Sequence, residues 1–186
     1  IKTGKPLRTF YGHTSSVTSA DFSPDGKIIA SSGMDKLIKF WDIESGKLLR
    51  TFNDAKDGIG IVTFSLKGER IASQSIDGMI MIHDVETGEL LKSFDCGRTG
   101  FTPVQFSPNG KMLAYGNNEN GISLFETDSM QTVGELKGHT RTVTSLDFSP
   151  DGKYIVSGSK DKTTRLWETK KRKLARVIHT GSGEIK

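Results

Sequence analysis

The sequence is poor in the features that mark secreted and membrane proteins. Its 186 residues include one cysteine, Cys96, so no disulfide can form within the chain and stability must come from packing. A single cysteine is compatible with a reducing compartment, and we expect an intracellular protein of the cytoplasm or nucleus. No apolar run approaches the length of about 18 residues that predicts a membrane-spanning helix, so we expect no membrane partner.

The chain also lacks the residue patterns of metal and nucleotide sites. Its four histidines are spread along the sequence without an H-x-x-x-H or C-x-x-C pair, which argues against a zinc site. The tripeptide GIG at 58–60 has neither the further glycines nor the lysine of a phosphate-binding loop, and no helix is expected after it. We therefore expect no cofactor, no metal, no small-molecule substrate and no catalytic residue.

Charges of the two signs are nearly balanced. The chain carries 26 basic and 22 acidic residues, and one run of basic residues, KKRK at 170–173, accounts for the excess. This run could contact nucleic acid, an acidic partner or a membrane surface, but a solvated turn is the favoured interpretation. Nucleic-acid readers usually spread basic residues over a face and interleave aromatic residues, and neither feature is visible.

What the sequence has instead is a repeat of 42 residues without insertion or deletion. Its clearest marker is a pentapeptide that occurs as FSPDG at 22–26, FSLKG at 64–68, FSPNG at 106–110 and FSPDG at 148–152. A second marker is the dipeptide GH, whose positions in the four units hold Gly12-His13, Asp54-Ala55, Cys96-Gly97 and Gly138-His139. A fixed period of this length indicates stacked copies of one structural unit.

Each unit divides into four short strands separated by clusters of Pro, Gly, Asp and Ser. In the first unit we expect the strands near 16–22, 27–32, 37–42 and 47–52. The third strand is apolar on both faces, because Ile38 and Phe40 share one face and Trp41 lies on the other. Antiparallel units that cannot cover their own faces match radial packing, in which each sheet lies between two neighbours.

The dipeptide GH followed by Trp41-Asp42, in units of 42 residues, resembles the WD-repeat (Trp-Asp repeat) family of β-propellers. Only the first unit has both dipeptides; in place of WD the fourth has WE, the second HD and the third FE. The resemblance implies an all-β fold, a β-propeller of four-stranded antiparallel blades. We expect four complete WD-type blades with partial blades at both ends: the outer strand of a preceding blade at 1–10, blades 1 to 4 at 11–52, 53–94, 95–136 and 137–178, and the start of a following blade at 179–186.

Both ends of the sequence fall inside repeat units. Joining these ends would give a fifth blade without its two middle strands, with unpaired edges and bare apolar faces. We therefore interpret the sequence as a fragment of a larger propeller. Self-association of two copies through the open blade edges is the alternative.

Two units carry a histidine, a serine, an aspartate and a tryptophan at matching positions. The sets are His13, Ser31, Asp35 and Trp41 in the first unit and His139, Ser157, Asp161 and Trp167 in the fourth. A Ser-His-Asp catalytic site is one interpretation, but the presence of two copies and the lack of any sign of an oxyanion hole argue against it. The family resemblance implies a structural hydrogen-bond chain instead, in which Asp accepts from His, His contacts the Ser hydroxyl, and Ser accepts the indole N–H.

The second and third units have lost much of this set. The matching positions hold Ala55, Ser73, Asp77 and His83 in the second unit and Gly97, Tyr115, Glu119 and Phe125 in the third. Because the bridging histidine is missing, we expect these blades to depend on apolar contacts and to open locally before the first and fourth.

The resemblance also implies where a partner binds, because propellers bind ligands mainly through the loops at the ends of the central channel. Three positions per unit lie on this top face in the family: Ser16, Thr18 and Met34; Gly58, Gly60 and Ile76; Gly100, Thr102 and Asn118; and Thr142, Thr144 and Lys160. Met34 and Ile76 are apolar at turns that we expect to be exposed, which suggests contact with a protein. The glycines predict a shallow rim over the second and third units.

These observations together favour a non-enzymatic protein-interaction scaffold. Its propeller face would dock a protein or peptide partner within a larger assembly. One alternative is a regulatory or sensor domain of a larger signalling or NTPase protein. Another is a nucleic-acid or anion binder that uses the basic turn at 170–173.

Overall fold

The computed structural model describes residues 6–179, and all regular elements in this range are β-strands. They form four antiparallel sheets of four strands, and in each sheet the strands follow one another in chain order. This confirms the all-β fold with four-stranded antiparallel blades. Within residues 6–179 there is no helix with the length and apolar character that a membrane crossing requires.

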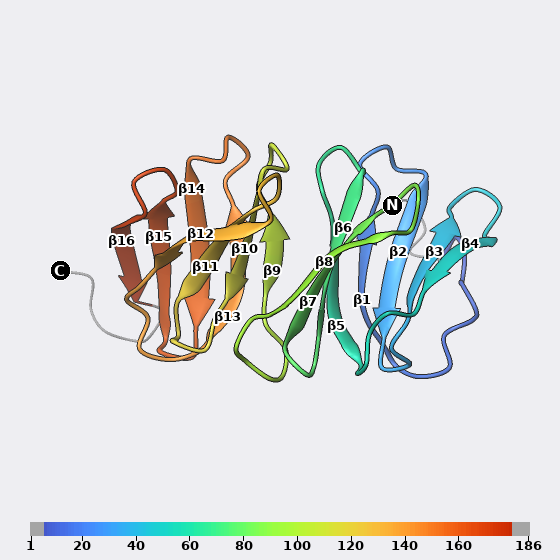
Figure 1. Cartoon of the computed structure of the whole chain (residues 1–186), viewed down its shortest axis with the longest axis horizontal. Coiled ribbons are helices and arrows are strands. Elements are labelled where there is room, and N and C mark those ends of the chain that lie inside the picture. The colour runs from blue at the N-terminus through green and yellow to red at the C-terminus, as the bar shows by residue number, and fades with distance from the viewer. Residues whose placement is uncertain (1–5, 180–186) are drawn as a thin grey trace.

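We number the sheets as blades 1 to 4 along the chain (Figure 1). Blade 1 consists of β1 (Val17–Phe22), β2 (Ile28–Gly33), β3 (Ile38–Asp42) and β4 (Leu48–Phe52). Blade 2 consists of β5 (Ile59–Phe64), β6 (Arg70–Ser75), β7 (Met79–Asp84) and β8 (Leu90–Asp95). Blade 3 consists of β9 (Val104–Phe106), β10 (Met112–Gly116), β11 (Ile122–Glu126) and β12 (Gln131–Leu136). Blade 4 consists of β13 (Val143–Phe148), β14 (Tyr154–Ser159), β15 (Thr163–Glu168) and β16 (Lys173–His179).

The turn between the first and second strands shows why the pentapeptide repeats. In blade 1 the Ser23 hydroxyl donates to Asp25 Oδ1 at 2.6 Å and accepts from the backbone N–H of Ile28 at 2.9 Å. Gly26 has a φ of 69°, a conformation that glycine adopts without strain. The turn therefore closes on its own hydrogen bonds, and this fixes the register of the strands that it joins.

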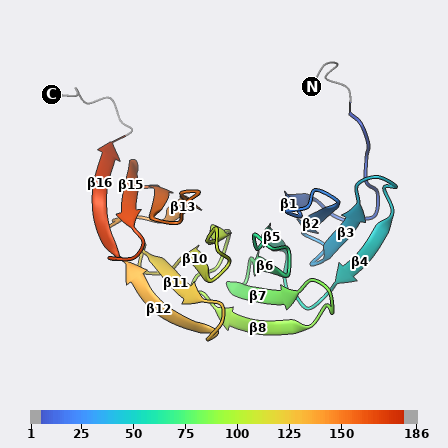
Figure 2. The same ribbon diagram turned by 90° about the horizontal axis from the view of Figure 1, so that it is seen from above.

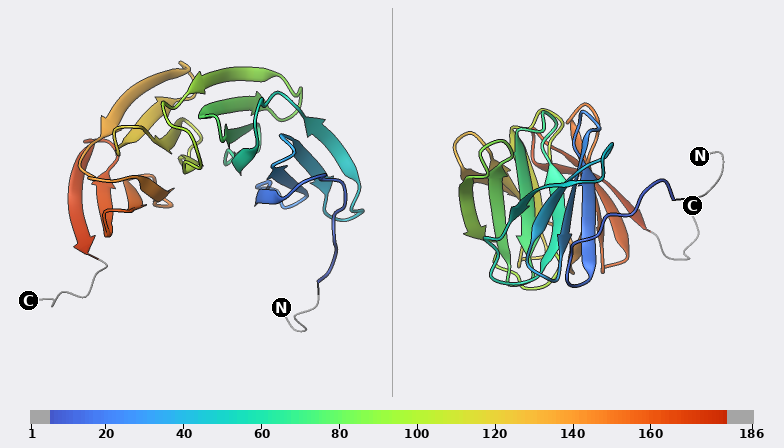
Figure 3. Two further views of the ribbon diagram at one scale, coloured as in Figure 1. Left: turned by 90° about the horizontal axis from the view of Figure 1, so that it is seen from below. Right: turned by 90° about the vertical axis from the view of Figure 1, so that its right-hand side faces the viewer.

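The four sheets stand side by side around an open arc (Figures 2 and 3). The first strand of each blade lies on the inner side of the arc, and the fourth strand lies on the outer side. Contacts between β1 and β5, β5 and β9, and β9 and β13 join neighbouring blades along the inner side. Loops at the two ends of the strands therefore form two faces. We call the face that carries the turns between second and third strands the top face, and the opposite one the bottom face.

The hydrophobic core lies between the sheets. The cluster between blades 1 and 2, for example, brings Phe40 and Phe52 against Val62 and Phe64. Equivalent clusters lie between blades 2 and 3 and between blades 3 and 4. This arrangement explains why the third strands are apolar on both faces, since each is covered by its own neighbours.

The outward faces of blades 1 and 4 are open in the described part of the chain. Phe22 is 64% exposed, whereas Phe64 and Phe148 at the matching positions are 7% exposed. On the other side Val156 is 39% exposed, whereas its counterpart Ala30 is fully buried. Residues 1–5 and 180–186, on which much of the two expected partial blades falls, lie outside the described range.

Candidate functional site

In blade 1 a hydrogen-bond chain runs from the core to the top face. Trp41 Nε1 donates to Ser31 Oγ at 2.7 Å, and Ser31 Oγ lies 2.7 Å from His13 Nε2. His13 Nδ1 lies 2.8 Å from Asp35 Oδ2, which also accepts the backbone N–H of Thr14 at 3.0 Å. With His13 Nδ1 as the donor to the carboxylate, Trp41 donates to Ser31, Ser31 donates to His13 and His13 donates to Asp35, so every donor in the chain has an acceptor.

Blade 4 contains the same chain. Trp167 Nε1 donates to Ser157 Oγ at 2.8 Å, Ser157 Oγ lies 2.8 Å from His139 Nε2, and His139 Nδ1 lies 2.7 Å from Asp161 Oδ2. Burial alone would raise the pKa of Asp161, but hydrogen bonds from Thr163 and His139 hold it well below its usual range. The carboxylate is therefore charged at neutral pH and orients the imidazole.

The surroundings of the two serines argue against nucleophilic chemistry. Ser31 and Ser157 are 6% and 1% exposed, and each hydroxyl already accepts an indole N–H. A nucleophile must present its oxygen to a substrate beside an oxyanion hole. The contacts therefore favour the structural role that the resemblance implies.

Blade 2 replaces the chain with a different pair. Asp54 stands at the position of the loop glycine and His83 at that of the tryptophan, and Asp54 Oδ2 lies 3.0 Å from His83 Nε2. The His83 ring also stacks on Phe52, with centroids 4.8 Å apart. Burial lowers the pKa of His83, although Asp54 opposes this effect. Sequence reasoning missed the pair, and the signal was that the second unit has an acidic residue at one position and a histidine at the other.

Blade 3 fills the same space with stacked rings. Phe125 takes the tryptophan position and lies parallel to Phe94, with centroids 4.6 Å apart and planes 12° from parallel. Asn117 Nδ2 donates to Ser123 Oγ at 3.0 Å behind the turn. The reliance on apolar contacts that the sequence predicts thus fits blade 3 better than blade 2.

The twelve residues expected at the top face differ in exposure. Five are exposed: Ser16, Met34, Asn118, Thr144 and Lys160. Five are partly buried: Thr18, Gly60, Ile76, Gly100 and Thr142. Gly58 and Thr102 are buried, so the structure leaves neither of them free to contact a partner directly. Thr102 is held inside because its backbone N–H donates to Gln74 Oε1 at 3.2 Å.

Apolar side chains cover Gly58, which precedes β5, and Gly60 within it, so the rim over the second unit is not shallow, whereas the space at Gly100 of the third unit is open. A Cβ atom at Gly58 would lie 2.9 Å from Met34 Sδ and 3.2 Å from Ile76 Cδ1. A Cβ atom at Gly60 would lie 2.1 Å from the Phe101 ring. The glycines therefore admit side chains of this chain itself, and we call the resulting surface of Met34, Ile76 and Phe101 the channel patch.

Phe101 is the member of the channel patch that sequence reasoning missed. It lies in the loop between β8 and β9, and its side chain is 61% exposed. A hollow of about 280 Å³ opens beside it on the inner side of the arc, between β5, β9 and β13, and Leu146 forms part of the opposite wall. A large exposed ring next to a hollow is a typical anchor for a partner side chain.

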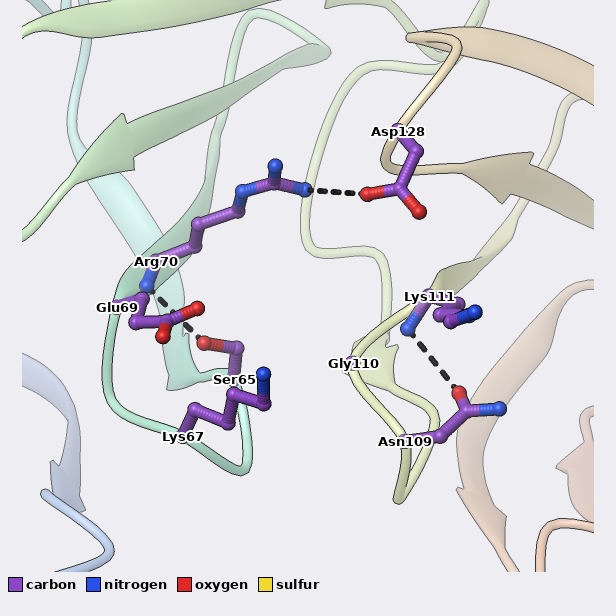
Figure 4. A pocket seen from close by; sticks show the side chains of 8 residues that line it. All are labelled: Ser65, Lys67, Glu69, Arg70, Asn109, Gly110, Lys111 and Asp128. Atoms are coloured by element: carbon purple, nitrogen blue, oxygen red, sulfur yellow. Dashed lines mark hydrogen bonds and ion pairs between the residues drawn. The ribbon is translucent and has the colours of Figure 1, made fainter.

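A second hollow, of about 170 Å³, lies on the bottom face between blades 2 and 3 (Figure 4). Arg70 reaches across it, donating from Nη1 to Thr127 O at 2.8 Å and lying 3.7 Å from Asp128 Oδ1. The other charged lining residues are Lys67, Glu69 and Lys111. Because both signs of charge surround the hollow and Arg70 is already paired, its chemistry favours no single class of ligand. In residues 6–179 no group of three or more His, Cys, Asp or Glu side chains could hold a metal ion.

Arginine and glycine meet at the junctions between blades on the outer side. Arg8 Nη1 donates to Ser45 O at 3.0 Å, and a Cβ atom at the adjoining Gly46 would lie 2.6 Å from Arg8 Nη1. Arg50 repeats the contact one blade later, donating to Val85 O at 2.8 Å. An arginine thus caps the turn of the next blade.

At the junction of blades 3 and 4 this pair is reversed, and the reversal involves the basic turn at 170–173. Gly134 takes the arginine position and Arg172 takes the glycine position, so that a Cβ atom at 134 would lie 2.7 Å from Arg172 Nη1. Lys171 Nζ lies 2.6 Å from Glu168 Oε2, and this hydrogen bond raises the pKa of Lys171. Part of the basic turn is therefore engaged within the protein.

Comparison with known proteins identifies the repeat. Residues 4–42 match the family model described as WD domain, G-beta repeat. A segment of 40 residues is 45% identical to the "WD repeat-containing protein AAC3" of Dictyostelium discoideum, covering 22% of this chain and 8% of that protein. Another 40-residue match, 48% identical, is to the "Target of rapamycin complex subunit wat1" of Schizosaccharomyces pombe, covering 22% of this chain and 13% of that protein. The "U3 small nucleolar RNA-associated protein 21" of Saccharomyces cerevisiae is 39% identical over 41 residues, which are 22% of this chain and 4% of that protein.

The matched segments span only a small part of these relatives. A longer match is to the family model described as Echinoderm microtubule-associated protein second beta-propeller, which extends over residues 24–180. That match covers well over half of the chain, and the four sheets have the blade architecture that such a match requires. This protein therefore belongs to the WD-repeat β-propeller family.

Proposed function

We propose that this chain is a non-enzymatic scaffold, inside the cell, that docks a protein or peptide partner on its top face within a larger assembly. Two of the relatives support the second half of this proposal through their names. One is described as a subunit of the target of rapamycin complex and another as associated with the U3 small nucleolar RNA. Both descriptions place WD-repeat proteins among the components of assemblies.

The channel patch is the observation that carries the proposal. Phe101 is 61% exposed and Met34 is 40% exposed, and both lie on loops held by rigid sheets. Exposed aromatic and methionine side chains at a channel rim gain free energy when a partner removes them from water, by about 25 cal/mol per Å² of apolar area buried. Loops on a rigid scaffold are also the usual location of binding residues.

The basic turn supports the nucleic-acid alternative less well. Lys171 pairs with Glu168, and Arg172 packs against Gly134. Counterion release requires several cations that are free to contact phosphates, and here the turn holds part of its charge against the protein. We therefore assign partner binding to the top face.

A matched pair of variants tests the proposal. Phe101→Asp places a charge in the channel patch, and Leu66→Asp makes the same kind of change at a residue that is 58% exposed in the bottom-face turn. Proteins captured from a cell extract by the unchanged chain should be lost with Phe101→Asp and kept with Leu66→Asp. Equal capture by both variants, at unchanged melting temperature, would contradict top-face docking.

A further inference from the structure

The top of blade 2 lacks a ring that occupies the corresponding space in blades 1 and 4. In blade 1 the His13 imidazole lies between Asp35 and Ser31, with contacts of 2.8 and 2.7 Å. In blade 4 the His139 imidazole makes the same two kinds of contact. Ala55 stands at this position in blade 2, and a methyl group makes neither bond.

Both partners of the missing ring are still present in blade 2. Ser73 is fully buried, and its Oγ has no hydrogen-bond partner among the described residues. Asp77 accepts from the Ser75 hydroxyl and from the backbone N–H of Met79, but no cationic side chain pairs with it within residues 6–179. Its counterpart Asp161 has an imidazole at 2.7 Å. Buried polar groups usually have partners, so this pair marks the place that the imidazole takes in blades 1 and 4.

A pocket of about 260 Å³ has Asp77 in its lining, together with Asp54 and Lys56, which flank Ala55 in the sequence. Met79 and Met81 of β7 and Leu90 of β8 give it an apolar wall, and Asp54 and Asp77 lie on its loop side. The strands β7 and β8 form the outer half of blade 2 (Figure 2), whereas Phe101 of the channel patch lines the hollow between β5, β9 and β13. The pocket is therefore a separate site.

The charge of the lining is negative. Asp54 contacts His83, but burial lowers the pKa of that imidazole, so the ring is neutral near pH 7 and leaves the carboxylate uncompensated. Lys56 also lines the pocket and supplies one positive charge against the two carboxylates. An apolar wall beside an excess of negative charge suits a long aliphatic chain that ends in a cation.

We propose that this pocket binds a lysine side chain of a partner peptide. The methylene chain lies against Met79 and Met81, and the ammonium group lies on the side of Asp54 and Asp77. The site goes beyond the proposed docking on the channel patch, because none of its residues belongs to that patch. It exists in blade 2 because the repeat there has lost its histidine without losing the aspartate.

Methionine methyl NMR tests this proposal, because Met79 and Met81 line the pocket and the chain has three other methionines as internal controls. The chain carrying ¹³C-methyl methionine is titrated with N-acetyl-lysine N-methylamide. The matched probe is N-acetyl-norleucine N-methylamide, which has the linear chain without the ammonium group. We expect saturable shifts of the Met79 and Met81 signals, constant signals from Met112 and Met130, and binding of the norleucine probe weaker by at least about tenfold.

Two variants separate charge from shape. Asp77→Asn keeps the shape of the side chain and should weaken binding of the lysine probe by at least about fivefold, with Asp54→Asn as the replacement if the first variant fails to fold. Ala55→His adds an imidazole beside Asp77 and should abolish binding. No saturable shift, equal binding of the two probes, or binding that survives both changes would overturn the proposal. The Phe101→Asp capture experiment reports on a different surface, so the two proposals can fail independently.

Discussion

Ala55→His is the change that best tests our reading of the hydrogen-bond chains. The aspartate and the serine that bind the imidazole in blades 1 and 4 are both present in blade 2, as Asp77 and Ser73. Ser73 Oγ is buried and has no partner in the described residues, so the native blade carries an unsatisfied hydroxyl. Adding the imidazole should therefore stabilise the protein.

The magnitude follows from the two bonds that the ring would form. A hydrogen bond to a charged carboxylate contributes about 1.5–3 kcal/mol, and one to a neutral hydroxyl about 1 kcal/mol. Ordering the new side chain and shifting the contacts of Ala55 with the core between blades 1 and 2 oppose this gain. We expect a net increase of about 1–2 kcal/mol in the free energy of unfolding, or roughly 2–8 °C in melting temperature.

Urea denaturation at pH 7.5, followed by tryptophan fluorescence, measures this change. Ala55→Leu is the control for volume, because it adds a side chain of similar size without hydrogen-bonding groups. The gain from Ala55→His should shrink by about 1 kcal/mol when Ser73 is replaced by alanine, and the larger part of it should be lost when Asp77 is replaced by asparagine, because these changes remove the hydroxyl and the charged carboxylate in turn. A neutral or destabilising Ala55→His, or a gain that is unchanged by both the Ser73 and the Asp77 replacement, would refute the reasoning.

Three further expectations follow from the structure. Gly134→Arg alone should destabilise the junction of blades 3 and 4. Adding Arg172→Gly should restore the arginine–glycine arrangement that Arg8 and Arg50 make, and a double-mutant cycle should report a coupling of about 1 kcal/mol. The folded-state pKa of His83 lies below its ordinary value of 6.5, because burial disfavours the charged ring. Its contribution to stability is therefore complete above pH 6.5 and is lost as the pH falls from there through the lower folded-state pKa, so His83→Phe should reduce the slope of unfolding free energy against pH between 7 and 5. When hydrogen exchange is measured on the chain alone, the backbone amides of blades 1 and 4 should exchange faster than those of blades 2 and 3, because blades 1 and 4 each have one open face. The sequence alone predicts the opposite order.

The repeat made the architecture predictable. Four turns with nearly the same residues, spaced without insertion, place the strands of blade 1 within one residue of their positions in the structure. The turn from Ser23 to Ile28 closes on local hydrogen bonds, so its form depends little on the rest of the fold. The hydrogen-bond chains of blades 1 and 4 could likewise be anticipated, because each of their residues keeps its own position in the unit.

Met34 and Ile76 of the channel patch were predicted at the top face from the repeat, but Phe101 could not be predicted in the same way. Phe101 lies in a loop where Gly97 and Gly100 have φ values of 75° and 86°, and no alternation of strand residues fixes the direction of its side chain. Thr102, its neighbour, was expected at the surface and is buried by a hydrogen bond to Gln74. The loop conformation alone decides which of the two side chains meets solvent.

Some contacts of the fold depend on two residues that differ from the repeat together, and a comparison of single positions between the units does not predict them. Blade 2 keeps a polar contact at its top because Asp54 and His83 change together, and blades 3 and 4 keep their junction because Gly134 and Arg172 trade places. Ala55 has no such compensation, so Ser73 and Asp77 lack the imidazole contact that their counterparts make, and Asp77 lines a pocket. When a second residue changes with the first, the contact between the blades or strands is preserved. When a residue such as Ala55 changes alone, polar groups lose their partner and the surface has different chemistry from that of the other blades. In a repeat protein, the second kind of departure is where a binding site specific to one blade should be sought.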